Sequence, residues 1–124
     1  MKVLVLDDHE GFRNEIVAIL ARTGHEASGA GSPEEAIPLV ENGDYDFLLV
    51  DYQMPGHDGI WFMQHVKRPR RTKAILVTAH VNPQVTDAMF KSGACGYIIK
   101  PFDEADLLRH LDFHSRGTDK PSLW

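Results

Sequence analysis

The stretch that decides the fold is residues 47–59, which read FLLVDYQMPGHDG. It opens with an unbroken apolar run that stops at the carboxylate of Asp51. An apolar run without polar alternation is typical of a strand covered on both faces, as in a parallel sheet. A helix is then predicted to begin near Asp58 and Gly59 and to end before Pro69.

Three further apolar runs also end at polar residues. They are residues 3–6 before Asp7 and Asp8, residues 74–77 before Thr78, and residues 96–99 before Lys100. A weaker strand is expected around residues 25–30. Because these runs alternate with segments of helical periodicity, the predicted order is (βα)5. Parallel strands need right-handed crossovers, so we predict a doubly wound α/β fold with helices on both faces of a five-stranded parallel sheet. Among known doubly wound folds we expect the flavodoxin-like one, with strand order 2-1-3-4-5.

Capping residues mark the predicted helix starts. Residues 32–35, Ser-Pro-Glu-Glu, combine an N-cap, a proline at the first helical position and a capping-box glutamate. Asn82 before Pro83 and the carboxylate of Asp103 predict two later helix starts. Pro38 lies inside the second predicted helix and is expected to bend or shorten it, because proline lacks a backbone donor.

Length and composition restrict the class of protein. The 124 residues suit one domain, assigned to residues 1–115, with residues 116–124 as a polar tail or the start of a linker. The formal net charge of −5 argues against direct nucleic-acid binding. No apolar run approaches the length of a membrane span, and the single Cys95 suits a reducing compartment, so a cytoplasmic protein is expected.

The polar residues that end the strands should meet, because a parallel sheet brings its carboxyl ends to one edge. They are Asp7, Asp8, Asp51, Thr78 and Lys100. Three neighbouring carboxylates repel one another, and Mg²⁺ would relieve this repulsion because it prefers hard oxygen ligands. A carboxylate can then attack a phosphoryl group and form an acyl phosphate. The Lys100 ammonium and the Thr78 hydroxyl can stabilise the phosphoryl oxygens.

With these residues at its strand ends, the chain resembles the receiver domain of two-component response regulators. The matching segments, in order, are Asp7-Asp8, residues 51–59, Thr78-Ala79 and residues 93–102. The resemblance spans about residues 2–114. It implies that Asp51 is the phosphoacceptor and that Asp8 binds Mg²⁺ directly. It further implies that Asp7 acts mainly through a water and that Gln53 offers its backbone carbonyl to the metal.

The resemblance also implies a switch. Thr78 and Lys100 would bind the phosphoryl group, and the Tyr97 ring would turn inward as Thr78 moves. The Lys100–Pro101 peptide bond would be cis. The phosphoryl donor would be a sensor histidine kinase or a histidine phosphotransfer protein. The fourth helix, fifth strand and fifth helix would carry the signal to a protein partner, an output domain or a second copy of the chain.

Three alternatives remain open at this stage. A receiver-like binding module that is never phosphorylated would have the same fold. An aspartyl-phosphate phosphohydrolase would place a second aspartate two residues after the nucleophile, where this chain has Gln53. A flavin-binding protein would need a Ser/Thr/Gly-rich phosphate loop, where Asp7 and Asp8 would repel a phosphate. We therefore expect no enzyme beyond one that assists its own phosphorylation and dephosphorylation.

Several residues carry weaker hypotheses. His9, His57 and His80 follow predicted strand ends and are hypothesised to line the phosphorylation site and make it pH-dependent, although solvated loop histidines are the simpler reading. Gln53 and His80 also stand at positions that influence phosphoryl lifetime in the family, so that lifetime is open.

A histidine pair and a basic segment also stand out in the sequence. His110 and His114 lie four residues apart, too few ligands for a closed metal site. The basic residues 67–73 are expected at the opposite edge of the sheet, as a solvated connector or a docking site for a partner.

Overall fold

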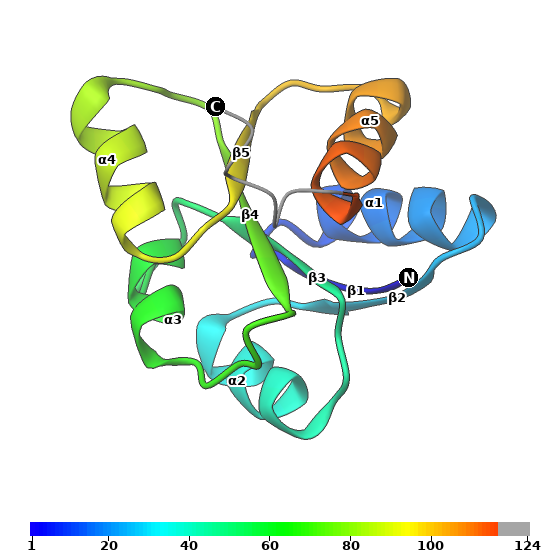
Figure 1. Cartoon of the computed structure of the whole chain (residues 1–124), viewed down its shortest axis with the longest axis horizontal. Coiled ribbons are helices and arrows are strands. Elements are labelled where there is room, and N and C mark those ends of the chain that lie inside the picture. Colours follow the sequence, from blue (N-terminus) through cyan, green and yellow to red (C-terminus); the bar gives the residue numbers. More distant parts are fainter. Residues whose placement is uncertain (117–124) are drawn as a thin grey trace.

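A computed structural model describes residues 1–116. In that part of the chain, five strands alternate with five helices (Figure 1). In chain order these are β1 (Lys2–Leu6), α1 (Glu10–Arg22), β2 (Glu26–Ala30), α2 (Pro33–Asn42), β3 (Phe47–Asp51), α3 (Gly59–His65), β4 (Lys73–Thr78), α4 (Pro83–Lys91), β5 (Gly96–Ile99) and α5 (Glu104–Ser115). The predicted tail, residues 116–124, lies outside the described residues except for Arg116. None of the helices described is long and apolar enough to cross a membrane.

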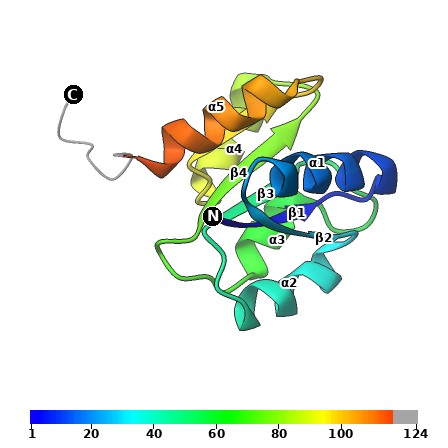
Figure 2. The same cartoon turned by 90° about the vertical axis from the view of Figure 1, so that its right-hand side faces the viewer.

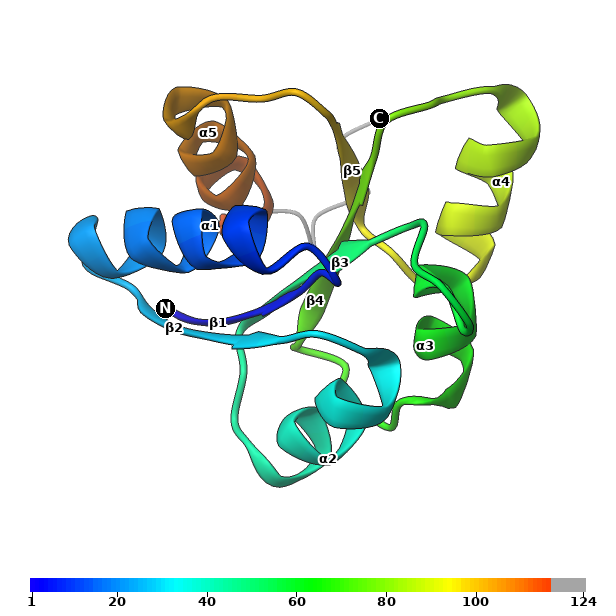
Figure 3. The same ribbon diagram turned by 180° about the vertical axis from the view of Figure 1, so that it is seen from behind.

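The strands form one parallel sheet in the order β2-β1-β3-β4-β5, as predicted. The order reverses between β1 and β3, which lie side by side with Leu6 opposite Val50. Figure 2 shows the sheet with α1 and α5 on one side and α2 and α3 on the other. Figure 3, from behind, shows α4 on the same side as α2 and α3. The carboxyl ends of β1 and β3 therefore meet at the point where ligand sites form in doubly wound sheets.

Two apolar layers cover the two faces of the sheet. Successive side chains of β3 point to opposite faces. Leu48 and Val50 belong to the layer under α2, α3 and α4, whereas Phe47 and Leu49 belong to the layer under α1 and α5. Every residue of β3 is buried. The central strand can therefore be apolar throughout, and its first polar residue, Asp51, comes at the end of the strand.

The predicted helix starts are confirmed. The Ser32 hydroxyl accepts the Glu35 N–H at 3.1 Å, and Asn82 accepts the Val85 N–H at 2.9 Å. Asp103 forms a reciprocal capping box at the start of α5. These side chains satisfy backbone donors that have no partner within the helix.

The expectation that Pro38 shortens the second helix is wrong, because α2 continues to Asn42. Pro38 cannot donate to the Glu34 carbonyl, but both residues are exposed, so water can hydrate that group. The third helix does begin at Gly59, capped by Asp58, and ends at His65. It is a short helix, and residues 66–72 lead from it to β4.

Candidate functional site

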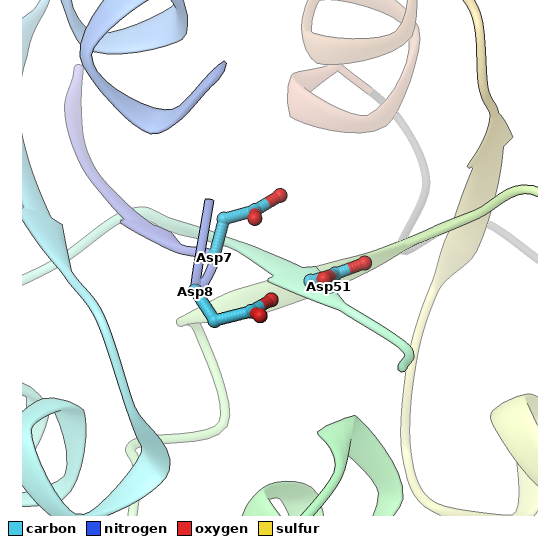
Figure 4. A group of neighbouring side chains, drawn as sticks. All are labelled: Asp7, Asp8 and Asp51. Atoms are coloured by element: carbon cyan, nitrogen blue, oxygen red, sulfur yellow. The ribbon is translucent and has the colours of Figure 1, made fainter. Parts of the chain in front are cut away.

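Three carboxylates from two neighbouring strand ends converge at the carboxyl edge of the sheet. Asp7 and Asp8 follow β1, and Asp51 is the last residue of β3. One oxygen of each can be chosen so that all lie within 4.8 Å of one another, and Figure 4 shows the side chains directed to one region. Asp7 is only 2% exposed and Asp51 only 7%, whereas Asp8 is exposed. Two of the three charges are therefore largely removed from water.

A small pocket of about 200 Å³ opens beside this cluster. It is lined by Asp8, His9, Asp51, Gln53, Thr78, Ala79 and Lys100. These residues come from the loops and strand ends after β1, β3, β4 and β5. All strand-end residues singled out from the sequence except the deeper Asp7 thus border one concavity, large enough for a small anion with its hydration.

The ionised form of Asp51 is disfavoured in this site. Burial, together with the nearby carboxylate of Asp7, raises the pKa of Asp51 to about 6. The ammonium of Lys100 opposes this shift, and Asp8 adds to it weakly. A cation bound between the carboxylates would remove the repulsion, so the donor set fits a hard divalent ion.

Lys100 is the cation of the pocket. Its Nζ donates to Asp7 Oδ2 at 3.3 Å and to Asp51 Oδ1 at 3.4 Å. On another side, Nζ lies 4.5 Å from the centre of the Phe12 ring. The peptide bond from Lys100 to Pro101 is cis, as the resemblance implies. The Lys100 ammonium is thus paired with two of the three clustered carboxylates.

Thr78 and Tyr97 occupy the positions named for the switch. The Thr78 hydroxyl donates to the His80 carbonyl at 2.9 Å and accepts from the His80 N–H at 3.2 Å. The Tyr97 ring is half-buried and packs edge-on against Phe90 of α4, with ring centres 6.2 Å apart. Thr78 is therefore tied to the β4–α4 loop, and Tyr97 to α4.

Four supporting contacts were not foreseen from the sequence. Arg13 donates to the Asp7 carbonyl at 2.9 Å, and the His9 N–H donates to Asp7 Oδ1 at 2.8 Å. A side chain at Gly59 would place its Cβ only 2.5 Å from the Asp51 carbonyl oxygen, so only glycine fits. Phe12, beside Lys100, makes the fourth contact. The Asp-Gly at residues 58–59 was read only as a helix start; nothing in the sequence signals the Arg13 and Phe12 contacts, because both depend on helix docking.

Of the three histidines hypothesised to line the phosphorylation site, only His9 borders the pocket. His57 does not: its ring stacks on Trp61 with centres 3.6 Å apart, and its Nε2 lies 3.8 Å from a Glu34 oxygen. His80 contacts Thr78 through its backbone, and its side chain is absent from the pocket lining. His110 and His114 join no group of three metal-ligating side chains among the described residues.

The basic residues 67–73 lie at the opposite edge of the sheet, as expected, and most of their charge is used locally. Arg68 donates to the carbonyls of Thr72 and Gly93. Arg71 pairs with Asp44 and Asp46, and Lys73 donates to a carbonyl of α5. The segment is thus a connector between α3 and β4 whose hydrogen bonds and ion pairs are mostly to neighbouring parts of the chain.

A family model described as the response regulator receiver domain matches residues 3–112. The chemotaxis protein CheY-3 of Vibrio cholerae is 30% identical over 116 residues, covering 90% of this chain and 89% of that protein. The transcriptional regulatory protein ResD of Bacillus subtilis is 31% identical over 123 residues, covering 99% of this chain but 51% of ResD. A CheY-like receiver domain from Methanospirillum hungatei superposes with a TM-score of 0.87 at 26% identity, over 96% of both chains.

Proposed function

The chain belongs to the response regulator receiver domain family, and we propose that it accepts a phosphoryl group from a phosphohistidine on Asp51 in a Mg²⁺-dependent reaction. Receiver domains are signalling modules, and residues 1–115 are proposed to form this one. The observation that carries the proposal is the meeting of Asp7, Asp8 and Asp51 near Lys100, at a small pocket lined by Asp8, Asp51 and Lys100.

The proposed step is a displacement at phosphorus. A carboxylate oxygen of Asp51 forms the new O–P bond while the N–P bond of the donor breaks, and the imidazole nitrogen takes back the electron pair. Lys100 already lies 3.4 Å from Asp51 and would stabilise charge on a phosphoryl oxygen. Thr78 would donate its hydroxyl to another oxygen, exchanging its bond to the His80 carbonyl. The same groups would assist hydrolysis of the acyl phosphate, and no other substrate is proposed.

The residues proposed to hold Mg²⁺ are Asp8 and Asp51, with Asp7 through water and Gln53 through its backbone carbonyl. These donors are all oxygens, and Gln53 lines the same pocket as Asp8 and Asp51. When bound, the ion would supply positive charge that offsets the repulsion between the carboxylates. Its binding should keep Asp51 ionised and so keep the nucleophile available near neutral pH.

The proposed readout surface consists of α4, β5 and α5. Phe90, Ile99 and Phe113, one from each element, are each at least 49% exposed. Phosphorylation would draw Thr78 toward the phosphate and release space for Tyr97, which packs on Phe90. We propose that this surface receives a downstream protein, an output domain or a second copy of the chain. The phosphoryl donor would be a sensor histidine kinase or a histidine phosphotransfer protein, in the cytoplasm.

The deciding experiment incubates the protein with acetyl phosphate or phosphoramidate, with and without Mg²⁺, and records the intact mass. We expect one added phosphoryl group in the wild type, only with Mg²⁺, and none in Asp51→Asn. Asp46→Asn is the matched control, because Asp46 is an aspartate at the opposite edge of the sheet and should not affect labelling. An unmodified wild type would refute phosphoacceptance and favour a binding module.

A further inference from the structure

We infer that Phe12 is a positioning residue that holds the Lys100 ammonium against its ring, within hydrogen-bonding reach of the Asp51 carboxylate. The Nζ atom lies 4.5 Å from the ring centre, within the range in which an ammonium is attracted to an aromatic face. The catalytic significance of this contact rests on the proposed function, but the contact itself does not.

The carboxylates alone hold Lys100 loosely. Its bonds to Asp7 and Asp51 are 3.3 and 3.4 Å long, at the outer limit for a hydrogen bond. The lysine stem has four rotatable bonds and loses much rotamer freedom when it is held in one place. Its side chain is 23% exposed, so water can compete for the ammonium. A third contact is therefore needed to keep Nζ beside Asp51.

An aromatic face suits this third contact better than another carboxylate. It attracts the ammonium but accepts no conventional hydrogen bond, so the N–H groups stay available for phosphoryl oxygens. A fourth carboxylate would add to the repulsion that already raises the pKa of Asp51. The Phe12 ring supplies confinement without adding net charge to the pocket.

Phe12 is itself held in place. Its ring packs edge-on against Phe102, with centres 5.7 Å apart and planes at 86°. Both rings pack on the apolar layer under α1 and α5. Phe102 follows Lys100 by two residues, so the same short segment carries the lysine and the ring that supports Phe12. α1 is thereby connected to the carboxyl end of β5 through this aromatic pair.

The first measurement reads the contact directly. Methylene protons of Lys100 next to Nζ should be shifted upfield by the ring current of Phe12, in a spectrum of lysine-labelled protein assigned with Lys100→Arg. The shift should disappear in Phe12→Leu, which keeps an apolar side chain, and persist in Phe12→Tyr. Tyr45→Leu removes another ring that faces a lysine, at 4.9 Å from Lys2 Nζ, and should leave the Lys100 signal unchanged. A wild-type Lys100 signal without an upfield shift would overturn the inference.

The second measurement tests whether the contact affects the rate of phosphorylation. With Mg²⁺ and acetyl phosphate, the maximal phosphorylation rate of Phe12→Leu should fall about three- to tenfold, while the donor concentration for half-maximal rate changes little. Phe12→Tyr should recover most of the rate, and Tyr45→Leu should react like the wild type. An active wild type with an unchanged rate in Phe12→Leu would overturn the positioning role. A wild type that is never phosphorylated would instead refute the proposed function, and the spectrum would still decide whether Phe12 holds Lys100.

Discussion

At the carboxyl end of the sheet, three carboxylates face the single ammonium of Lys100, whereas at the amino end Asp44 and Asp46 are matched by Arg71 and by the backbone N–H of Lys2. Two of the three carboxyl-end carboxylates, Asp7 and Asp51, are enclosed, and the Asp51 side chain is only 8% exposed. The amino-end charges are open, with the Asp44 side chain 79% exposed. The fold thus pairs charge at one edge and concentrates unbalanced charge at the other.

The larger pocket does not lie at the edge that holds the acidic cluster. A groove of about 610 Å³ lies at the amino end, beside Asp46, Arg70 and Arg71, and is larger than the 200 Å³ pocket beside Asp51. The smaller pocket holds the strongly perturbed carboxylate. A buried carboxylate that destabilises the fold when no ligand is bound is a more specific sign of a functional site than the volume of a pocket.

The largest expected effect concerns stability. Without divalent ions at pH 7.5, Asp51→Asn should raise the free energy of unfolding by about 3 kcal/mol, since raising the pKa of Asp51 to about 6 makes its ionisation costly in the folded state. Urea denaturation measures this. Asp46→Asn, at the amino end, should change stability by less than about 1 kcal/mol, and in the opposite direction.

The pH dependence tests the cause of that effect. Between about pH 4 and 6 the unfolded chain loses the Asp51 proton before the folded protein does. The wild type should therefore lose stability relative to Asp51→Asn as pH rises through this window, and the two should converge below pH 4. A difference that is constant from pH 4 to 8 would contradict burial and repulsion as its origin.

Thr72, directly before β4, and Thr78, its last residue, lie at the two opposite edges of the sheet. Thr72 donates to the Tyr45 carbonyl at 2.7 Å, and Thr78 donates to the His80 carbonyl at 2.9 Å. Thr72→Val should cost about 1 to 2 kcal/mol in urea denaturation, because a buried acceptor loses its donor. Thr78→Val should cost less, because its acceptor at His80 is only partly buried and water can replace the lost donor. Only Thr78→Val should also slow phosphorylation, by about tenfold or more. Equal labelling rates in both variants would remove Thr78 from the reaction.

Magnesium should act on one edge alone. At ten times its dissociation constant, Mg²⁺ should raise the free energy of unfolding of the wild type by about 1.4 kcal/mol. Thermal melts should show this gain lost in Asp8→Asn and retained in Asp44→Asn, whose carboxylate pairs with Arg71. A gain that survives in Asp8→Asn would place the ion elsewhere.

The smallest effect is expected at Arg71. Its guanidinium is half-exposed and pairs with Asp44 and Asp46, and exposed pairs contribute little. Arg71→Ala should change the free energy of unfolding by less than about 0.5 kcal/mol and leave the phosphorylation rate unchanged. A large loss of labelling by a donor protein, but not by acetyl phosphate, would instead identify this edge as a docking site.

Much of the fold was predictable because its signals are local. The apolar run before Asp51 has no alternation, since β3 is buried on both faces, and capping side chains act within a few residues. The expectation that Pro38 would shorten the second helix was wrong because the cost of a missing donor depends on exposure, which a sequence does not display. For His57, the sequence placed it after a strand end but could not foresee its stacking on Trp61.

By itself, the sequence determined the strand-ending residues Asp7, Asp8, Asp51, Thr78 and Lys100 and the parallel order that directs them to one edge. Only the tertiary structure decided what surrounds each of them: Phe12 over Lys100, the Asp51 carbonyl against Gly59, and the depth that raises the pKa of Asp51. Periodicity and capping act through neighbours along the chain, whereas desolvation, repulsion and ring contacts depend on distances that exist only after the helices dock on the sheet.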